Sequence, residues 1–154
     1  MVKILFVCHG NICRSPMAEF IMKELVRREK IENKFLISSA ATTNDEIGSD
    51  MYPNAKNELK LHSIPFERRR ARRITRDDYE TWDYIIAMDQ ENLQHLRHIM
   101  REDSVNKIKL LMSFAGENRE VSDPWYTRDF SEAYCDIYKG CEALLKQIKI
   151  SNEI

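Results

Sequence analysis

Apolar residues near the start of the chain form a short run with a single polar break. The run extends from Val2 to Val7, and Lys3 is the only polar residue within it. A short apolar run that ends in loop-forming residues is typical of a strand buried on both faces of a sheet. The pattern therefore predicts a first strand here. Similar runs predict three further strands, over Phe35–Ser38, Tyr84–Met88 and Lys107–Leu111.

Between these runs the apolar positions recur with the spacing of helices. The first helix is predicted from Met17 to about Glu29, directly after Pro16, a residue that suits a helical first turn. A longer apolar stripe predicts a final helix from about Phe130 to Lys149. Three shorter helical segments are predicted over Asn54–Leu61, at a capping arrangement in Thr75–Asp78, and after Asp89 with Leu93, Leu96 and Met100 on one face.

Alternation of strands and helices limits the architecture. Strands joined through helices form a parallel sheet with right-handed crossovers, and helices cover both of its faces. A chain of 154 residues has the usual length of one domain. The sequence thus predicts an α/β fold, with a single three-layer domain over residues 1–154. Ligands of such sheets bind at the carboxyl ends of the strands.

Composition argues against several classes of protein. Hydrophobic residues make up 43% and charged residues 32%, as in ordinary globular proteins, and the net charge is −1. That balance argues against binding to nucleic acid or a membrane, and the first apolar run is too short for a signal peptide or a spanning helix. Five arginines occupy residues 68–73. They are interpreted as a solvated loop, because no aromatic platform for nucleic acid accompanies them.

The four cysteines, Cys8, Cys13, Cys135 and Cys141, match neither a disulfide framework nor a zinc pattern. They favour a reducing, cytoplasmic setting. His95 and His98 are three residues apart, but the sequence offers no third ligand beside them. The sequence therefore predicts no metal site.

The segment between the first strand and the first helix carries the strongest chemical signal. Cys8 stands at the end of the strand, six residues before Arg14. The amide groups of such a loop and the following helix bind anions, and Gly10 and Asn11 tolerate the positive φ angles of a tight curl. Arg14 would grip an oxyanion with its planar fork. A thiol beside these charges loses its proton readily, with Ser15 placed to donate a hydrogen bond to it. A lone cysteine is more often a core residue, but this combination favours a cysteine-dependent phosphatase.

The string CHGNICRSP over residues 8–16 resembles the signature loop C-x5-R-[ST]-P of the low-molecular-weight protein tyrosine phosphatases. The resemblance extends to SSAAT at 38–42, EIG at 46–48, AMD at 87–89 and SDPWY at 122–126. It implies hydrolysis of phosphotyrosine and aryl phosphates through a cysteinyl-phosphate. It further implies strand order 2-1-3-4, no cofactor, and as partners a phosphotyrosine protein and phosphate or other oxyanions.

The resemblance also implies a role for each matching residue. Cys8 would be the nucleophile, Arg14 would bind the phosphoryl oxygens, and Asp123 would be the general acid and later the base for water. Trp125 and Tyr126 would flank the aromatic ring of the substrate. The other residues expected to contact the substrate are His9, Gly10, Asn11, Ile12, Cys13, Ser15 and Asp45.

The loop itself would be supported by Asn11, Ser15 and Ser39, again by resemblance. Cys13 would trap oxidised Cys8 as a disulfide and so protect the nucleophile. An interpretation of Cys13 as a small space-filling residue remains open beside this one.

Three positions depart from the family pattern. Asp45 stands where the family usually has an aromatic residue that forms the other wall of the substrate groove. The run Arg68–Arg70, with one residue inserted, replaces a histidine that supports the loop, so this support is either an arginine or missing. His9 replaces a small or apolar residue after the cysteine, and would tune substrate access or the thiolate.

Three alternative functions are weighed against this prediction. A protein-arginine phosphatase on the same fold is less favoured, because Ile12 and the pair Trp125-Tyr126 match the phosphotyrosine enzymes. A thioredoxin-coupled arsenate reductase would need cysteines that residues 62–112 lack. A phosphate-binding module without turnover would not need Cys8 and Asp123 intact.

Overall fold

The structure, a computed structural model, describes all residues 1–154 and is built around one parallel sheet. Its four strands lie in the order β2-β1-β3-β4, and every pair of neighbours is parallel. The strand order and the α/β architecture predicted from the sequence are confirmed. The strands are β1 (Val2–Cys8), β2 (Phe35–Ala41), β3 (Tyr84–Ala87) and β4 (Ile108–Leu110).

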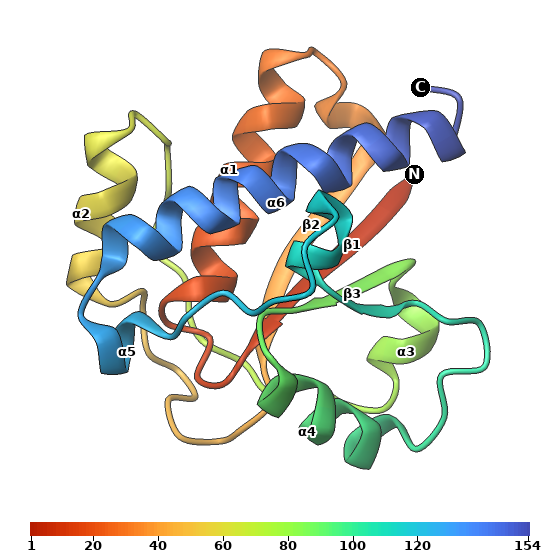
Figure 1. Cartoon of the computed structure of the whole chain (residues 1–154), viewed down its shortest axis with the longest axis horizontal. Helices are drawn as coiled ribbons and strands as arrows, with labels where there is room; N and C mark the ends of the chain where they lie inside the picture. The colour runs from red at the N-terminus through yellow and green to blue at the C-terminus, as the bar shows by residue number, and fades with distance from the viewer.

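Side chains of the central strand β1 alternate between two separate cores. Ile4 and Phe6 belong to the larger core, which lies against α1 and α6, whereas Leu5 and Val7 belong to a smaller core on the opposite face. Figure 1 shows α1 and α6 crossing one face of the sheet, with α3 and α4 on the other side. The longer helices are α1 (Arg14–Arg28), α2 (Pro53–Leu61), α4 (Gln90–Met100) and α6 (Phe130–Ser151).

The structure contains four short helical turns, and the sequence signalled only one of them. Two of them lie between β4 and α6, and β4 is shorter than predicted because Leu111 already belongs to the next turn. Single turns of this kind depend on local caps rather than on an apolar stripe. These turns are η1 (Glu32–Lys34), α3 (Asp78–Thr81), η2 (Leu111–Ala115) and α5 (Pro124–Thr127).

The capping arrangement predicted at Thr75–Asp78 is present in a different form. The Asp77 side chain makes no cap hydrogen bond to α3. Asp78 instead accepts a hydrogen bond of 2.7 Å from the backbone amide of Thr75, and it forms an ion pair with Arg72.

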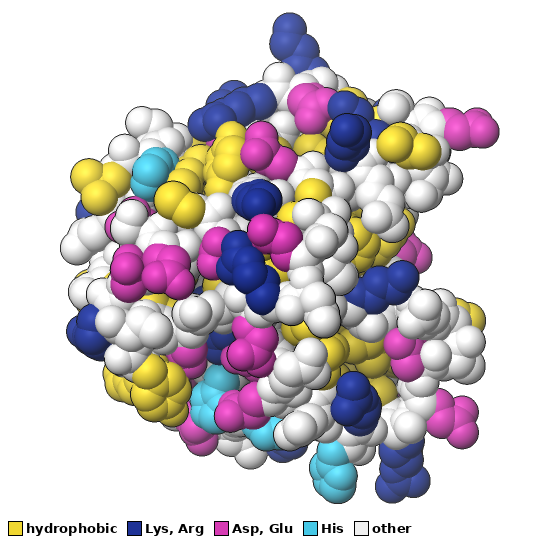
Figure 2. All heavy atoms as spheres, in the orientation of Figure 1, with side chains coloured by type: hydrophobic (Ala, Val, Ile, Leu, Met, Phe, Trp, Pro, Cys, Tyr) yellow, Lys and Arg dark blue, Asp and Glu magenta, His cyan; other side chains and the backbone are white.

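The exterior agrees with the balanced composition. Figure 2 shows acidic and basic side chains interspersed over the visible face. None of the helices combines the length and the apolar character that a bilayer span requires.

Candidate active site

The loop after β1 places the Cys8 sulfur at the start of α1. The side chain of Cys8 is buried, and its Sγ lies 3.0 Å from Ser15 Oγ. The backbone amide of Ser15 donates to the same sulfur at 3.4 Å. Because α1 begins at Arg14, this amide is one of the unpaired donors of the first helical turn. A hydrogen-bond donor and the positive end of the helix dipole therefore meet at the Cys8 sulfur.

Asn11 supports the loop from behind. Its side chain is fully buried, and its φ of 59° lies in the left-handed region, as predicted. Its Nδ2 donates to Ser15 Oγ at 2.8 Å and to Ser39 Oγ at 2.9 Å. Its Oδ1 accepts from the guanidinium of Arg69 and, at 3.2 Å, from the amide of Arg72. The network predicted for Asn11, Ser15 and Ser39 is therefore present, with two arginines added to it.

One expectation about the loop conformation is wrong. Gly10 does not adopt a positive φ, so the left-handed curl rests on Asn11 alone. A Cβ added at Gly10 would meet Glu46 only at ordinary contact distance.

The arginine run is not a uniformly solvated loop. Arg68 and Arg70 are exposed, as predicted, but Arg69 is half-buried and bonded to Asn11. Burial lowers the pKa of Arg69, although the nearby charges of Glu19, Cys8 and Asp50 oppose this effect. Of the two possibilities that the sequence left open, an arginine support or none, the contact of Arg69 with Asn11 favours the first.

Arg69→Ala is expected to reduce kcat by up to about 10²-fold, because loss of its contact with Asn11 lets the loop shift relative to the substrate. Binding of inorganic phosphate should weaken in parallel, since the resemblance places oxyanions in this loop. Arg70→Ala, on the neighbouring exposed residue, is the matched control. Equal activities of the two variants would show that Arg69 does not position the loop.

Arg14 is held in a fixed orientation beneath the pocket. Only 2% of it is exposed, and its Nη1 donates to Asp89 Oδ2 at 2.7 Å and to the Val121 carbonyl at 2.9 Å. Burial alone would lower the pKa of Arg14, but the charges of Cys8, Asp123 and Asp89 outweigh it and raise that pKa. The guanidinium is therefore fixed and charged. Asp89 is the N-cap residue of α4 and directly follows Met88 after β3, so its contact fixes the guanidinium near the end of that strand.

Asp123 lies at the start of α5, facing Arg14. Its Oδ1 accepts from the Trp125 amide at 3.0 Å and caps the helix, while its Oδ2 lies 3.3 Å from Arg14 Nη2. Trp125 is 46% exposed and contacts the ring of Tyr52 edge-on, and Tyr126 is 80% exposed. The two aromatic side chains project at the rim instead of packing into the core.

These groups enclose one pocket of about 170 Å³. Asn11, Ser15 and Ser39 do not line it. Asn11 and Ser15 were predicted both to bind substrate and to support the loop, and their side chains make the hydrogen bonds behind it. The lining residues are Cys8, His9, Gly10, Ile12, Cys13, Arg14, Asp45, Glu46, Asp123, Trp125 and Tyr126.

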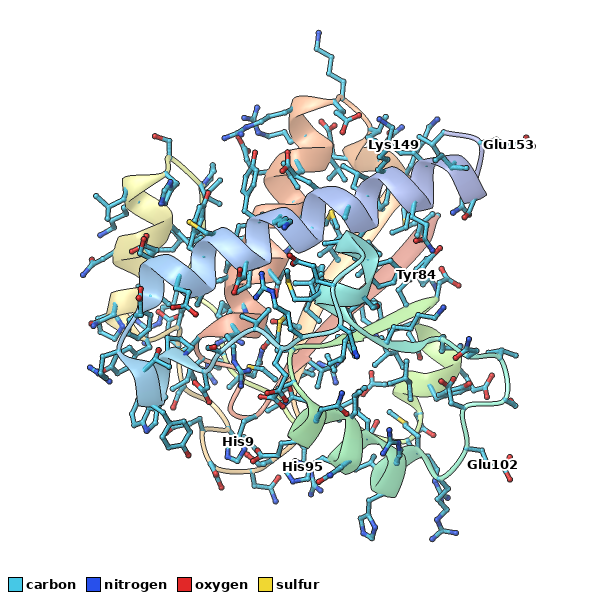
Figure 3. The ribbon with its side chains drawn as sticks, in the orientation of Figure 1. His9, Tyr84, His95, Glu102, Lys149 and Glu153 are labelled. Atoms are coloured by element: carbon cyan, nitrogen blue, oxygen red, sulfur yellow. The ribbon has the colours of Figure 1, made fainter.

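The wall opposite the aromatic rim is polar. His9 Nε2 lies 2.7 Å from Asp45 Oδ2, and His9 Nδ1 lies 2.8 Å from Glu91 Oε1. Partial burial would lower the pKa of His9, but hydrogen bonds to the two carboxylates raise it above its usual value. Figure 3 shows His9 at the end of the molecule where the loop meets α4.

Three acidic residues of the site were missed by the sequence analysis, and for a fourth, Asp89, the contact with Arg14 was not expected. Glu46 lines the pocket, Asp89 orients Arg14, Glu91 contacts His9, and Glu19 accepts a hydrogen bond of 2.6 Å from Ser39. Glu46 and Asp89 lie in segments that carried the family resemblance, and Asp89 follows a predicted strand. Glu91 lies on an exposed helix surface and Glu19 on a buried helix face, and neither gives such a signal.

The sequence model of the family described as "Low molecular weight phosphotyrosine protein phosphatase" matches residues 3–153. The low molecular weight protein-tyrosine-phosphatase YfkJ of Bacillus subtilis is 36% identical over 156 residues, covering 100% of each chain. The crystal structure of YfkJ is similar with a TM-score of 0.94 at 37% identity, over 98% of this chain and 96% of that one. The low molecular weight phosphotyrosine protein phosphatase of Gallus gallus is 40% identical over 149 residues, or 94% of each chain.

A structural neighbour of different stated activity is the Drosophila arginine phosphatase. Its crystal structure matches with a TM-score of 0.87 at 33% identity, over 96% of this chain and 98% of that one.

Proposed function

Since the chain belongs to the low molecular weight phosphotyrosine protein phosphatase family, we propose that it hydrolyses phosphotyrosine in proteins through a cysteinyl-phosphate. The observation that carries this proposal is the meeting of three groups in one pocket. The Cys8 sulfur lies at the helix start, Arg14 is fixed beside it, and the Asp123 carboxyl group lies within reach of Arg14.

The first step transfers the phosphoryl group to sulfur. The Cys8 thiolate attacks phosphorus as the bond to the tyrosine oxygen breaks, and Asp123 protonates that oxygen as it leaves. The loop amides and Arg14 bind the three equatorial oxygens, so charge is stabilised by donors that are already in place. Ser15 stabilises the thiolate before and after the transfer.

The second step regenerates the thiolate. Asp123, now a carboxylate, removes a proton from a water molecule that attacks the phosphorus atom from the side the phenol has left. The sulfur–phosphorus bond breaks, and inorganic phosphate remains in the loop until it dissociates. Phosphate and related oxyanions are therefore expected to inhibit competitively.

The rim of the pocket supports a preference for aromatic phosphoesters. Trp125 and Tyr126 offer exposed rings beside the pocket, and Ile12 lines it with apolar surface. A stacked aromatic pair contributes about 0.5–1.5 kcal/mol beyond the area it buries. The test compares release of phosphate from a phosphotyrosine peptide, from p-nitrophenyl phosphate and from a phosphoarginine peptide. Preference for the last would assign the chain to arginine dephosphorylation, and no release from any would indicate a binding module.

A reducing compartment, such as the cytoplasm, suits this chemistry. The four cysteines are all free thiols in the structure, and a thiolate nucleophile has to stay reduced.

Arg14→Lys is expected to reduce kcat/KM by about 10²–10³-fold, the range seen when one donor to a developing oxyanion is removed. A lysine ammonium is a point charge and cannot hold two phosphoryl oxygens in one plane. Steady-state kinetics and the affinity for phosphate both test this, with the unfolding temperature measured alongside because the side chain is buried. If rate and phosphate affinity are both retained, Arg14 does not bind the oxyanion.

Mild peroxide is expected to inactivate the enzyme reversibly. Peroxide converts the Cys8 thiolate to a sulfenic acid, and the Cys13 thiol then displaces water to form a disulfide that added dithiol reduces. Burial, followed by the charge of Cys8, raises the pKa of Cys13 to about 12, so Cys13 stays a thiol and resists direct oxidation. Mass spectrometry after peroxide treatment checks the linkage. Peroxide should inactivate the Cys13→Ser variant irreversibly. Accumulation of a Cys8 sulfinic acid with a free Cys13 thiol in the wild-type protein would contradict the disulfide role.

A further inference from the structure

Three metal-ligand side chains meet beside the mouth of the pocket. His9 comes from the loop after β1, and Glu91 and His95 come from α4; one ligand atom of each lies within 4.8 Å of the others. Glu91 and His95 are four residues apart in one helix, so they lie on the same face. Figure 3 shows His9 and His95 side by side at this end of the molecule, and Figure 2 shows histidine and acidic side chains together there.

From this juxtaposition we propose that His9, Glu91 and His95 bind a divalent metal ion of the zinc class. Two imidazoles and a carboxylate are a common zinc ligand set, with a fourth position left for water. The inference stands on these residues and is independent of the phosphatase activity. It departs from the sequence analysis, which paired His95 with His98 and expected no metal.

The spacing of the three ligand atoms suits a tetrahedral ion. Bonds of about 2.0–2.1 Å to nitrogen and oxygen place two ligands of such an ion roughly 3.3 Å apart. His9 Nδ1 and Glu91 Oε1 are 2.8 Å apart, and the His9 and His95 rings have centroids 6.2 Å apart. The three ligand atoms lie within 4.8 Å of one another, so an ion would have to draw them closer to bind all three.

Outer-shell partners already hold both imidazole rings. His9 Nε2 lies 2.7 Å from Asp45 Oδ2, which leaves Nδ1 directed toward Glu91. His95 Nδ1 lies 3.0 Å from the hydroxyl of the buried Thr42, which leaves its other nitrogen as the ligand. A carboxylate or hydroxyl on the far nitrogen of a histidine is the usual support of a metal ligand, because it fixes the tautomer and the ring. Asp45 and Glu91 also supply two negative charges that offset those of the ion.

The competing explanation is that protonation of His9, and not a metal ion, holds the cluster together. A protonated His9 donates to Asp45 and Glu91 at once and satisfies both without any metal. In that case His95 contributes nothing beyond its contact with Thr42. The role of His95 therefore separates the two explanations.

The test is titration calorimetry with Zn²⁺ on a Cys8→Ser/Cys135→Ser background, in which the thiol at the helix start and the exposed thiol have been removed. We expect one ion per chain. His95→Gln and Glu91→Gln should each weaken binding by at least about tenfold, the smaller end of the cost of losing even an outer-shell partner. His98→Gln, an exposed residue on the same helix, should bind as the parent does. Circular dichroism verifies that each variant is folded.

Co²⁺ added to the wild-type chain supplies an independent readout. Nitrogen and oxygen ligands give only weak visible bands, whereas a thiolate ligand adds an intense sulfur-to-metal charge-transfer band. The site is supported if Co²⁺ gives visible bands without the charge-transfer band and if those visible bands disappear in His95→Gln. Absence of stoichiometric Zn²⁺ binding, binding unchanged in His95→Gln, or a charge-transfer band lost in Cys8→Ser would each overturn it.

Discussion

Cys8→Ser is expected to lower kcat by roughly 10⁴-fold or more, on the scale of the losses seen when a covalent nucleophile is removed. A serine hydroxyl at this position has no adjacent base, and it holds its proton far more tightly than a thiol. The anion-binding part of the loop is unchanged, because the Ser15 amide and the Arg14 guanidinium remain. Phosphate should therefore bind Cys8→Ser with nearly wild-type affinity.

The measurement pairs steady-state hydrolysis of p-nitrophenyl phosphate with calorimetric titration of phosphate. Cys135→Ser is the control, since Cys135 is exposed on α6 and away from the pocket, and it should retain full activity. Wild-type turnover by Cys8→Ser would exclude a cysteinyl-phosphate. If Cys8→Ser lost both phosphate binding and turnover, the substitution would instead have distorted the loop.

The sheet could be predicted from the sequence because each strand is a self-contained signal. Burial on both faces requires an apolar run, and the alternation of Ile4 and Phe6 with Leu5 and Val7 between two cores satisfies that requirement directly. The Cys8-to-Arg14 loop was predictable for a similar reason, since spacing within a few residues determines its shape. The strand order came from the family resemblance.

Contacts between residues distant in the chain could not be predicted in this way. Arg69 reaches Asn11 across 58 positions, and within the sequence it is indistinguishable from Arg68 and Arg70. His9 and Glu91 are 82 positions apart, and only the parallel pairing of β1 with β3 brings their elements together. Sequence periodicity specifies which face of an element is buried, whereas such polar pairs depend on how the elements are placed.

Asp123→Asn is expected to reduce the rate by about 10²–10⁴-fold for aryl phosphates with basic leaving groups, the usual contribution of a general acid. The substitution removes the proton donor and the ion pair with Arg14, but it keeps the helix cap. An asparagine oxygen can still accept from the Trp125 amide, and asparagine caps a helix as well as aspartate does. The group that faces Arg14 at 3.3 Å becomes an amide NH2, so this contact and its charge are lost while the helix cap is kept. The aromatic rim should therefore keep its position.

The leaving-group series separates proton donation from loop geometry. A phenolate of low basicity departs without a proton, so Asp123→Asn should hydrolyse such esters at a rate much closer to that of wild type. A plot of log rate against leaving-group pKa should be steep for the variant and shallow for wild type. Asp129→Asn, at the cap of the next helix and exposed to solvent, is the matched control and should follow wild type throughout.

Equal losses across the series would mean that Asp123 only shapes the loop, and another acid would have to supply the proton. The structure ranks the two remaining aspartates near the pocket. Asp89 is engaged by Arg14 through one oxygen and by the Asn92 amide through the other, so it is poorly placed to carry a proton. Asp45 lines the pocket and is paired with His9, which can deliver a proton to it. Asp45→Asn would then be expected to reproduce the steep leaving-group dependence that Asp123→Asn had failed to show.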